Sequence, residues 1–352
     1  MNPRAFSQAL LAAALFGAAT PASKWLLDAL SPQVLAGLFY LGAAAGIAPL
    51  MGRRRSARWG WPSDALNQRR LLGAILFGGV LGPLLLLLGL QHTSAASTAM
   101  LLNLETPATA LLALVWFREH LGKLAWIANG GLLAAGVLLS LGGGKPGLIG
   151  AGLVALATLA WGLDNNLTAL IDGITPSECT FWKGLVAGTT NLVIGLSLTP
   201  TAWSSAWLWA LAIGVLAYGA SIVLYIRSAQ SIGAARSQMV FATAPFWGIV
   251  LAVAFLGEPL SIWQGLALVL ICLALVLLFL EQHEHPHVHP VQAHTHGHRH
   301  DDGHHNHTHP GLAASVYHTH DHEHELLEHS HPHLPDLHHR HSHAAATEPN
   351  EA

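Results

Sequence analysis

The chain has 352 residues, of which 52% are hydrophobic and 10% are charged, and its formal net charge is −3. Soluble domains carry about 25% charged residues, so this composition excludes a soluble enzyme, a disordered protein and a secreted disulfide scaffold. The average conceals two unlike parts. Residues 1–280 hold 14 Lys and Arg against 8 Asp and Glu, whereas residues 281–352 hold 2 against 11, with 23 of the 25 histidines. The first part is predicted to lie in a membrane and the second to be a polar tail, and no nucleic-acid partner is expected.

Ten apolar segments in the first part are long enough to cross a bilayer as helices, which takes about 20 residues each. Backbone polar groups cannot stay unpaired in lipid, and the segments are too long for barrel strands, so we predict an all-α membrane bundle. The first segment stays apolar to about Leu30, which favours a retained helix over a cleaved signal peptide. In chain order the predicted spans are 6–27, 33–51, 71–90, 94–116, 123–142, 147–168, 178–198, 206–226, 234–256 and 261–280.

The loop at 52–70 sets the predicted orientation, because it contains six arginines against the single acidic residue Asp64. Cytoplasmic loops are enriched in Lys and Arg, so this loop is placed in the cytoplasm. Counting spans from it predicts a cytoplasmic N-terminus and a cytoplasmic tail. We therefore expect a multi-pass protein of the cell (inner) membrane, surrounded by lipid, and a homodimer is left open.

The two halves of the hydrophobic part repeat at an offset near 139 to 145 residues, with one compensating single-residue slip between Gln91 and Glu119. Each half is predicted to hold five spans, an odd number, so the second half must enter the membrane from the opposite face. Such an inverted repeat allows a central site to open alternately to two sides. The predicted units are 1–142, 143–280 and the tail 281–352. The matching residues are Phe16-Gly17 with Trp161-Gly162, Ser31-Pro32 with Thr175-Pro176, Ala95-Ala96 with Ala234-Ala235, Pro107 with Pro245, and Glu119-His120-Leu121 with Glu258-Pro259-Leu260.

Residues 6–280 resemble the EamA-type branch of the drug/metabolite transporter superfamily. The most specific features are Ala234-Ala235, Pro245 and Leu256-Gly257-Glu258, together with Lys183 seven residues after Pro176. In the first half Phe39 stands where a basic residue would correspond to Lys183. The resemblance implies a secondary carrier of a small organic metabolite, with no catalytic residues and no required cofactor. It does not name the compound.

Glu105 is the sharpest candidate for a functional residue, because ionisable groups at the bilayer centre cost at least about 2.5–3.5 kcal/mol. It lies in the middle of the fourth predicted span, near Asn103 and two residues before Pro107, which removes a backbone hydrogen bond. A carboxyl group there can bind a proton or a cation that drives transport. The plainer alternative is a protonated glutamate hydrogen-bonded to a neighbouring helix.

A second polar group is predicted in the sixth span, where Asp164, Asn165 and Asn166 follow Trp161 by one helical turn. An aromatic wall with three polar side chains could line a cavity, and Asp164 could pair with a substrate cation or with Lys183. Interhelical hydrogen bonding that only holds the bundle together is the alternative. For Lys183, contact with an anionic substrate and extension to the membrane surface are also open.

Three further charged residues lie at predicted helix ends. Lys24 is expected to extend toward the membrane surface. Glu119 and Glu258, beside loops, are expected to have capping or boundary roles. No catalytic motif of a metalloprotease, phosphate-binding loop or serine hydrolase is present, so the chain is not expected to be an enzyme.

The tail is rich in alternating histidines, and neutral imidazole binds zinc, nickel, cobalt and copper. The tail has few apolar residues, so we predict that it is disordered and binds divalent metal with low selectivity. Incidental metal affinity of a solvated tail is the alternative. The predicted metal-binding residues are His283, His285, His287, His289, His294, His296, His298, His300, His304, His305, His307, His309, His318, His320, His322 and His324.

The sequence thus supports two hypotheses of function. The first is a secondary transporter, predicted to export a small organic metabolite by alternating access, with a tail that binds and senses metal. The second is a divalent-metal exporter that uses the tail to collect metal ions from the cytosol. The first is favoured, because the only histidines outside the tail, His92 and His120, lie at predicted helix ends.

Overall fold

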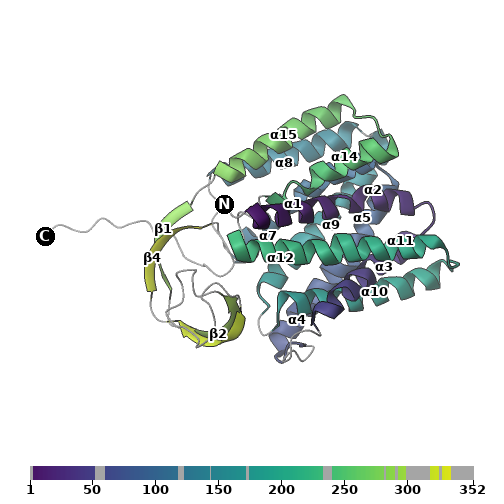
Figure 1. The fold of residues 1–352 in the computed structure, drawn as a ribbon. Helices are drawn as coiled ribbons and strands as arrows, with labels where there is room; N and C mark the ends of the chain where they lie inside the picture. Colours follow the sequence, from purple (N-terminus) through teal and green to yellow (C-terminus); the bar gives the residue numbers. More distant parts are fainter. Residues whose placement is uncertain are drawn as a thin grey trace.

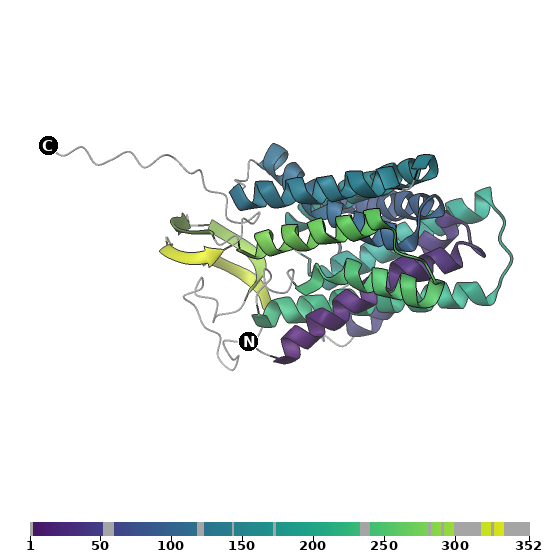
Figure 2. The same cartoon turned by 90° about the horizontal axis from the view of Figure 1, so that it is seen from above.

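Helices that run side by side form a bundle, and α1 begins at the same end of this bundle at which α15 ends (Figures 1 and 2). This arrangement comes from a computed structural model that describes residues 3–51, 60–117, 123–142, 144–171, 174–232, 240–280, 283–289, 292–298, 318–324 and 327–333. The helices of the first half are α1 (Pro3–Gly17), α2 (Ala19–Leu26), α3 (Pro32–Met51), α4 (Ala65–Ala74), η1 (Ile75–Leu81), α5 (Gly82–Gln91), α6 (Ala95–Leu101), η2 (Leu102–Leu104), α7 (Glu105–Phe117) and α8 (Lys123–Gly142). Those of the second half are α9 (Gly144–Ala169), α10 (Pro176–Leu198), α11 (Ser205–Ile213), η3 (Gly214–Ala220), α12 (Ser221–Ile232), α14 (Ala244–Leu256) and α15 (Ile262–Leu280).

The helices follow the predicted spans closely, although several spans consist of more than one element. The third span begins at Ala65, six residues earlier than predicted, and α14 begins at Ala244, after a segment that lies outside the described residues. The prediction of ten spans is met only in part and otherwise stays a prediction. By length and hydropathy, the described helices able to cross a membrane are Phe6–Leu26, Pro32–Pro49, Ala65–Gln91, Gly147–Thr168 and Ser205–Tyr225, and shorter apolar helices cover Trp126–Leu139, Ala244–Leu256 and Ile262–Leu277.

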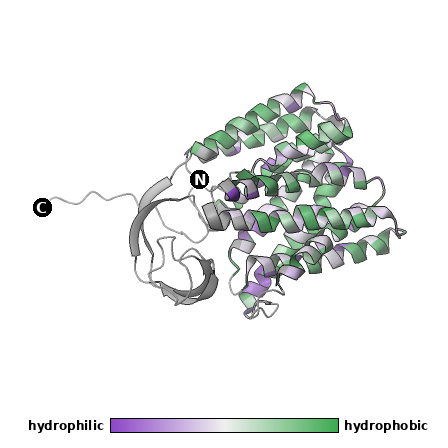
Figure 3. Cartoon of the chain, in the orientation of Figure 1, coloured by the Kyte–Doolittle hydropathy of each residue, from purple (hydrophilic) through white to green (hydrophobic). Residues whose placement is uncertain are grey.

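The surface of the bundle is apolar along its helices (Figure 3). Large hydrophobic side chains are exposed on many of them, including Phe255 at 79% and Ile262 at 74% of full exposure. A soluble protein rarely presents a contiguous apolar surface of this extent. The exposed side chains are therefore suited to contact with lipid, as expected for a membrane protein.

The same break in helical geometry occurs once in each half, 139 residues apart. η1 and η3 are π-helical segments of seven residues, and each sits between two α-helices. The N–H of Gly82 donates to Phe77 O and that of Ser221 donates to Leu216 O, five residues back in both cases. This offset agrees with the repeat read from the sequence, and such π segments are often found at functional sites.

Side-chain caps start the helices next to the arginine-rich loop. Asp64 accepts a hydrogen bond from the N–H of Asn67 at the start of α4, and this bond lowers the pKa of Asp64 because it stabilises the carboxylate. At the start of α10, Thr175 accepts from the N–H of Glu178 while the Glu178 carboxylate accepts from the N–H of Thr175. Glu178 also accepts from the N–H of Gly60, which ties the loop before α4 to α10.

Glycines allow α3 to lie close to the helices that flank it. A Cβ at Gly42 would overlap Leu211 O and lie 3.0 Å from the Cα of Gly214, and a Cβ at Gly214 would overlap Phe39 O. On the other side, a Cβ at Gly188 of α10 would lie 2.7 Å from the backbone nitrogen of Leu41. Small residues of this kind permit close helix packing in membranes, where water does not drive helices together.

The described helices of residues 3–280 agree with the prediction of an all-α bundle, while the described segments of the histidine-rich tail form four short β-strands; disorder of the tail as a whole stays a prediction. β1 (His283–His289) pairs antiparallel with β4 (Leu327–His333), and β2 (Gln292–His298) pairs antiparallel with β3 (His318–His324). The alternation of histidine with other residues has the two-residue period of a strand. Antiparallel pairing then satisfies backbone groups without a hydrophobic core, which the prediction from composition did not take into account.

Substitution of Gly42 by alanine should destabilise the bundle by about 1–3 kcal/mol, because the added methyl group forces α3 and α11 apart. Gly130→Ala in α8 is the matched control, since a Cβ at that position meets no atom within 4 Å. Thermal unfolding in detergent should show a lower midpoint for Gly42→Ala and an unchanged or higher midpoint for Gly130→Ala. Equal midpoints for the two variants would show that α3 is not packed as described.

Candidate functional site

The break at η1 leaves two backbone carbonyls without a helical partner in the middle of the bundle. The N–H of Gly82 donates to Phe77 O and not to Gly78 O, and Pro83 has no N–H to donate to Gly79 O. Unpaired carbonyls are costly in an apolar bundle, so other donors must reach them.

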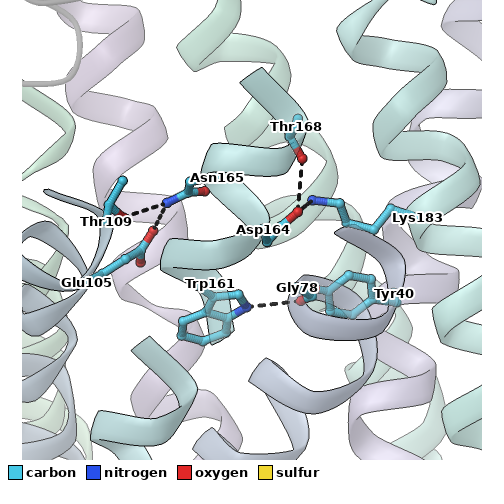
Figure 4. A network of polar contacts seen from close by, with 9 residues as sticks. All are labelled: Tyr40, Gly78, Glu105, Thr109, Trp161, Asp164, Asn165, Thr168 and Lys183. Carbon is cyan, nitrogen blue, oxygen red and sulfur yellow. Dashed lines mark hydrogen bonds and ion pairs between the residues drawn. The ribbon is translucent and has the colours of Figure 1, made fainter. Parts of the chain in front are cut away.

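Three side chains from other helices supply these donors. The hydroxyl of Tyr40 in α3 donates to Gly78 O at 2.6 Å, and the indole N–H of Trp161 in α9 donates to the same oxygen at 3.0 Å. The amide of Asn191 in α10 donates to Gly79 O at 3.1 Å. The freed carbonyls of one helix therefore fix the positions of α3, α9 and α10 around it (Figure 4).

Asp164 and Lys183 form an ion pair beside this junction. The Lys183 ammonium lies 2.7 Å from each oxygen of the Asp164 carboxylate, and the Thr168 hydroxyl donates to Asp164 Oδ1 at 2.9 Å. The side chain of Asp164 is 8% exposed and that of Lys183 is 16% exposed. The sequence left this pairing open as one alternative. Lys183 neutralises the negative charge of Asp164 inside the protein (Figure 4).

Glu105 belongs to a neighbouring group on the other side of α9. Its Oε1 accepts a hydrogen bond from the Asn165 amide at 2.7 Å, and the same amide contacts the Thr109 hydroxyl at 3.3 Å. Glu105 is half-buried and Asn165 is exposed. Within the described part of the chain, no cation ion-pairs with Glu105, because Lys183 is directed at Asp164 (Figure 4).

Asp164 and Asn165 follow one another in α9 but contact different helices, because each residue of a helix is rotated by about 100° from the last. Asp164 contacts α10, Asn165 contacts α7, and Asn166 donates to Thr109 O at 3.2 Å and to Gly162 O at 2.7 Å. α9 is thus the element that joins the Asp164–Lys183 pair to Glu105. The structure brings together six of the seven residues predicted as a site.

Asn103 is the exception. It is buried at 8% exposure and donates to Met100 O at 3.2 Å within its own helix. Its side chain therefore has a local role beside the Leu102–Leu104 break, and its link to Glu105 is through the backbone, where the Glu105 N–H donates to Asn103 O. Asn103 and Glu105 are close in the sequence, but their side chains do not face each other, because residues two apart on a helix point in different directions.

Several residues of the site could not have been chosen from the sequence. Tyr40, Thr109, Thr168 and Asn191 are ordinary polar residues in apolar helices, and their partners lie far away in the chain. Glycines of η1 are equally necessary, since a Cβ at Gly78 would overlap the Asp164 carboxylate. The pair Gly78-Gly79 followed by Gly82-Pro83 was the one signal that could have pointed to this position.

The two halves are not equivalent at this level. Phe16, which matches Trp161 in the sequence repeat, packs edge-on against Tyr218 of η3, with ring centroids 5.8 Å apart. A phenylalanine has no donor for a free carbonyl, so the polar network is built around η1. The ring of Tyr40 also contacts Tyr218 at 5.6 Å, which links the polar group to this aromatic cluster.

Comparison with known proteins gives the family of the chain. The EamA-like transporter family matches it twice, over residues 4–142 and 148–280. The chain belongs to the EamA-like transporter family. The resemblance inferred from the motifs is thereby confirmed, and it indicates membrane transport and not catalysis. The two matched regions correspond to the two halves that carry η1 and η3.

A curated relative and a solved structure are similar to this EamA-like protein. An "Uncharacterized transporter" of Methanothermobacter thermautotrophicus is 29% identical over 208 residues, which is 56% of this chain and 60% of the relative. The chain therefore spans less than two thirds of the length of that relative. A solved crystal structure shares 19% identity with a TM-score of 0.57, covering 80% of this chain and 98% of the other. It supports the fold alone.

No group of three or more potential metal ligands occurs among the described side chains of the EamA-like bundle. The backbone of the strands is described, but the positions of their histidine side chains are not, and His300, His304, His305, His307 and His309 lie outside the described residues. Metal binding by the tail therefore stays a prediction. The same applies to the role of Glu119, which also lies outside the described residues.

Replacement of Lys183 by methionine should lower the free energy of unfolding by about 3–5 kcal/mol, because it leaves the Asp164 carboxylate buried without its cation. The double variant Asp164→Asn/Lys183→Met should recover most of this loss. Unfolding by SDS in mixed micelles, followed by tryptophan fluorescence, measures both.

Arg70→Met is the control for loss of a cation. The recorded partners of Arg70 are the Asn67 amide oxygen and Leu170 O, both neutral, so its loss should cost about 1 kcal/mol. A double variant that is no more stable than Lys183→Met would contradict the proposed coupling of Asp164 with Lys183.

Proposed function

We propose that this EamA-like protein is a secondary transporter that exports a small organic solute by alternating access, with Glu105 as the group that couples transport to a proton or cation. The observation that carries the proposal is the difference between the two carboxylates at the centre of the bundle. Asp164 is neutralised by Lys183, whereas Glu105 is half-buried, hydrogen-bonded to an exposed amide and free of an ion-pair partner among the described residues. Glu105 is therefore the carboxylate that an incoming ion or solute can reach.

The chemistry of the site favours a solute with a polar or cationic group and an apolar body. Glu105, Asn165 and Thr109 offer oxygen and amide groups on one side of α9. The buried Tyr40, Tyr218 and Phe39 provide aromatic surface near the break in η1. In this scheme Glu105 carries the proton and the neighbouring Asn165 and Thr109 hold the solute, so that export of one solute molecule is matched by entry of one proton.

The repeated break supports alternating access. A π segment disrupts helical hydrogen bonds and gives a helix a place to bend, and here one lies in each half at the same repeat position. We infer that the halves have inverted topology across ten spans and that the two breaks serve as hinges. The arginine-rich loop and the tail would then face the cytoplasm.

We also propose that the tail binds divalent metal in the cytoplasm and adjusts transport to the metal supply. The alternative function, efflux of zinc, nickel or cobalt collected by the tail, has less support. The described side chains of the bundle contain no cluster of metal ligands that could form a path across it.

Glu105→Gln should abolish proton-coupled flux while preserving solute exchange, because glutamine keeps a hydrogen-bonding oxygen but cannot bind and release a proton. The protein in liposomes with a pH-sensitive dye is exposed to a panel of amino acids and other small metabolites. Proton movement should be lost in the variant, and exchange of labelled for unlabelled solute should continue at a similar rate. Glu178→Gln, in a cap at the helix start of α10, should keep both activities.

Coupled flux at the wild-type rate in Glu105→Gln would refute the coupling role. The same liposomes decide the alternative when they enclose a metal-sensitive dye. Movement of Zn²⁺ or Ni²⁺ without movement of any organic solute, abolished by deletion of residues 282–352, would establish the metal exporter instead.

A further inference from the structure

The strands of the tail place histidines opposite one another. In β1 and β4 the facing pairs are His283 with His333, His285 with His331, and His287 with His329. In β2 and β3 they are His294 with His322, His296 with His320, and His298 with His318. Directly opposed residues of an antiparallel pair share one face, with Cβ atoms about 4.5–5.5 Å apart. Each ladder therefore pairs histidine with histidine at three alternate positions of its backbone register.

The two ladders keep the same register. The first ladder ends with the pair His289 and Leu327. The second begins with the pair Gln292 and His324. From one pair to the other, the first residue number rises by three and the second falls by three. The described strands 283–289 and 292–298 therefore pair with 327–333 and 318–324 in a common register. This register is what brings twelve histidines into facing pairs.

We propose that the tail holds divalent metal between its strands, at neighbouring facing pairs of histidines, so that metal binding joins residues 283–298 to residues 318–333. Two adjacent pairs offer up to four imidazoles within one patch, the number of ligands that zinc accepts in a closed site. A two-stranded ribbon is marginal by itself in water. A metal that bridges the strands stabilises the paired form, because it binds that form and not the separated one. The proposal rests on metal binding by the tail proposed above.

The test compares variants that remove equal numbers of histidines from full-length protein in detergent, titrated with Zn²⁺ by calorimetry. Variant A replaces three histidines of β3 by glutamine, variant B replaces the three facing histidines of β2, and variant C replaces three histidines outside the described strands. The residues of variant A are His318, His320 and His322. Those of variant B are His294, His296 and His298, and those of variant C are His304, His305 and His307.

Variants A and B should each abolish the tight zinc sites of the β2–β3 ladder, which roughly halves the number of tight sites and leaves those of the β1–β4 ladder, and the combination of A and B should lose no more than either alone. This non-additivity follows because each variant already removes one half of every pair in the β2–β3 ladder. Variant C should retain all of the tight sites. Backbone amides of residues 292–298 and 318–324 should also gain hydrogen-exchange protection when Zn²⁺ is added to wild type.

Two outcomes separate the failures. No zinc binding by wild type would refute metal binding by the tail as a whole. Tight zinc binding that A, B and C reduce equally, or that A and B reduce additively, would refute the cross-strand sites while leaving metal binding in place.

A second, independent observation concerns the other end of the bundle, away from the start of α1 and the end of α15. Here the junction between α5 and α6 is held by three side chains from elsewhere. Lys24 of α2 donates to Leu90 O at 2.6 Å and to Thr93 O at 2.9 Å. The two oxygens of the Glu258 carboxylate accept from the N–H groups of Ala95 and Ala96, both at 2.9 Å.

The third contact comes from α15, where the Gln264 amide donates to Ser94 Oγ at 3.2 Å and to Ser97 Oγ at 2.9 Å. Gly257 brings Glu258 into place, because its backbone has φ of 65°, a left-handed conformation that favours glycine and ends α14. Lys24 therefore binds the carbonyl end of one helix and Glu258 the amide end of the next, and each charge is matched to the helix dipole.

We infer that Lys24, Glu258 and Gln264 form a latch that closes this end of the bundle and releases α6 when the transporter opens there. α6 leads through η2 to Glu105, so release of its first turn gives a route to the proposed coupling site. Both charged residues are half-buried, where hydrogen bonds to backbone groups can exchange with water. By the orientation inferred above, this is the outer face.

The sequence repeat pairs Glu258 with Glu119, and Ala95-Ala96 with Ala234-Ala235. A matching cap at the opposite end would let the two latches close in turn. Those residues lie outside the described part of the chain, so the inference depends on the contacts of Lys24, Glu258 and Gln264 alone.

The latch is tested by the accessibility of position 100, because Met100 is 1% exposed and lies in α6 just beyond the contacts. In a background with Cys179 and Cys272 replaced by alanine, Met100→Cys is labelled with a membrane-impermeant maleimide in sealed liposomes. Glu258→Ala should raise the labelling rate at least tenfold, and Glu258→Gln, which keeps one acceptor oxygen, should raise it less.

Glu178→Ala is the matched control, because Glu178 is also a carboxylate that accepts two backbone N–H groups, but at the start of α10. It should leave the labelling rate unchanged. Wild-type labelling in a folded Glu258→Ala protein, or equal acceleration by Glu178→Ala, would overturn the latch. The readout does not require transport, so its failure is distinct from failure of the proposed function.

Discussion

The central constraint on this protein is a pair of backbone carbonyls that its own helix cannot satisfy. A π segment shifts the hydrogen bond of Gly82 by one residue, and Pro83 contributes no N–H, so Gly78 O and Gly79 O remain open inside an apolar bundle. Water is scarce there, and the donors must come from the protein. Tyr40, Trp161 and Asn191 meet this need. Those three contacts place α3, α9 and α10 around η1.

The charged groups of the site depend on that arrangement. Once α9 and α10 are fixed against η1, Asp164 and Lys183 lie close enough for a bidentate ion pair, and Asn165 is turned toward Glu105 on α7. The glycines of η1 are part of the same solution, since any side chain at position 78 would occupy the space of the Asp164 carboxylate. The break in η1, the close packing and the ion pair thus form a single local structure. Of its two carboxylates, Asp164 has a cation, and Glu105 has none among the described residues.

Sequence alone predicts much of this fold, because a long apolar run has few physical solutions in a bilayer. The spans, the repeat and the family motifs follow from composition and spacing, and Glu105, Asp164, Asn165, Asn166, Trp161 and Lys183 stand out as polar residues in apolar surroundings. Apart from the pairing of Asp164 with Lys183, which the sequence left open as one alternative, the partners of those residues could not be predicted, since they depend on which helices are neighbours. Asn103 was grouped with Glu105 by proximity in the chain, but bonds within its own helix. Lys24 was expected to extend toward the membrane surface, but binds the end of α5. The prediction for the tail came from its composition, although its histidines recur every two residues, which is the period of a strand.

The contrast between Trp161 and Phe16 has a consequence for a carrier built from two halves. If the two halves were identical, swapping their conformations would convert one state of the carrier into the other, and the two states would have equal energy. Here the indole of Trp161 holds Gly78 O in one half, whereas Phe16 packs against the rings of Tyr218 and Phe241 in the other. In the proposed alternating-access cycle the two states would therefore differ in free energy, and the empty protein would rest mainly in one of them. A difference of about 1.4 kcal/mol already gives a tenfold preference. Residue 16 is thus a position at which a single side chain can set the resting orientation of the molecule without touching its charged site.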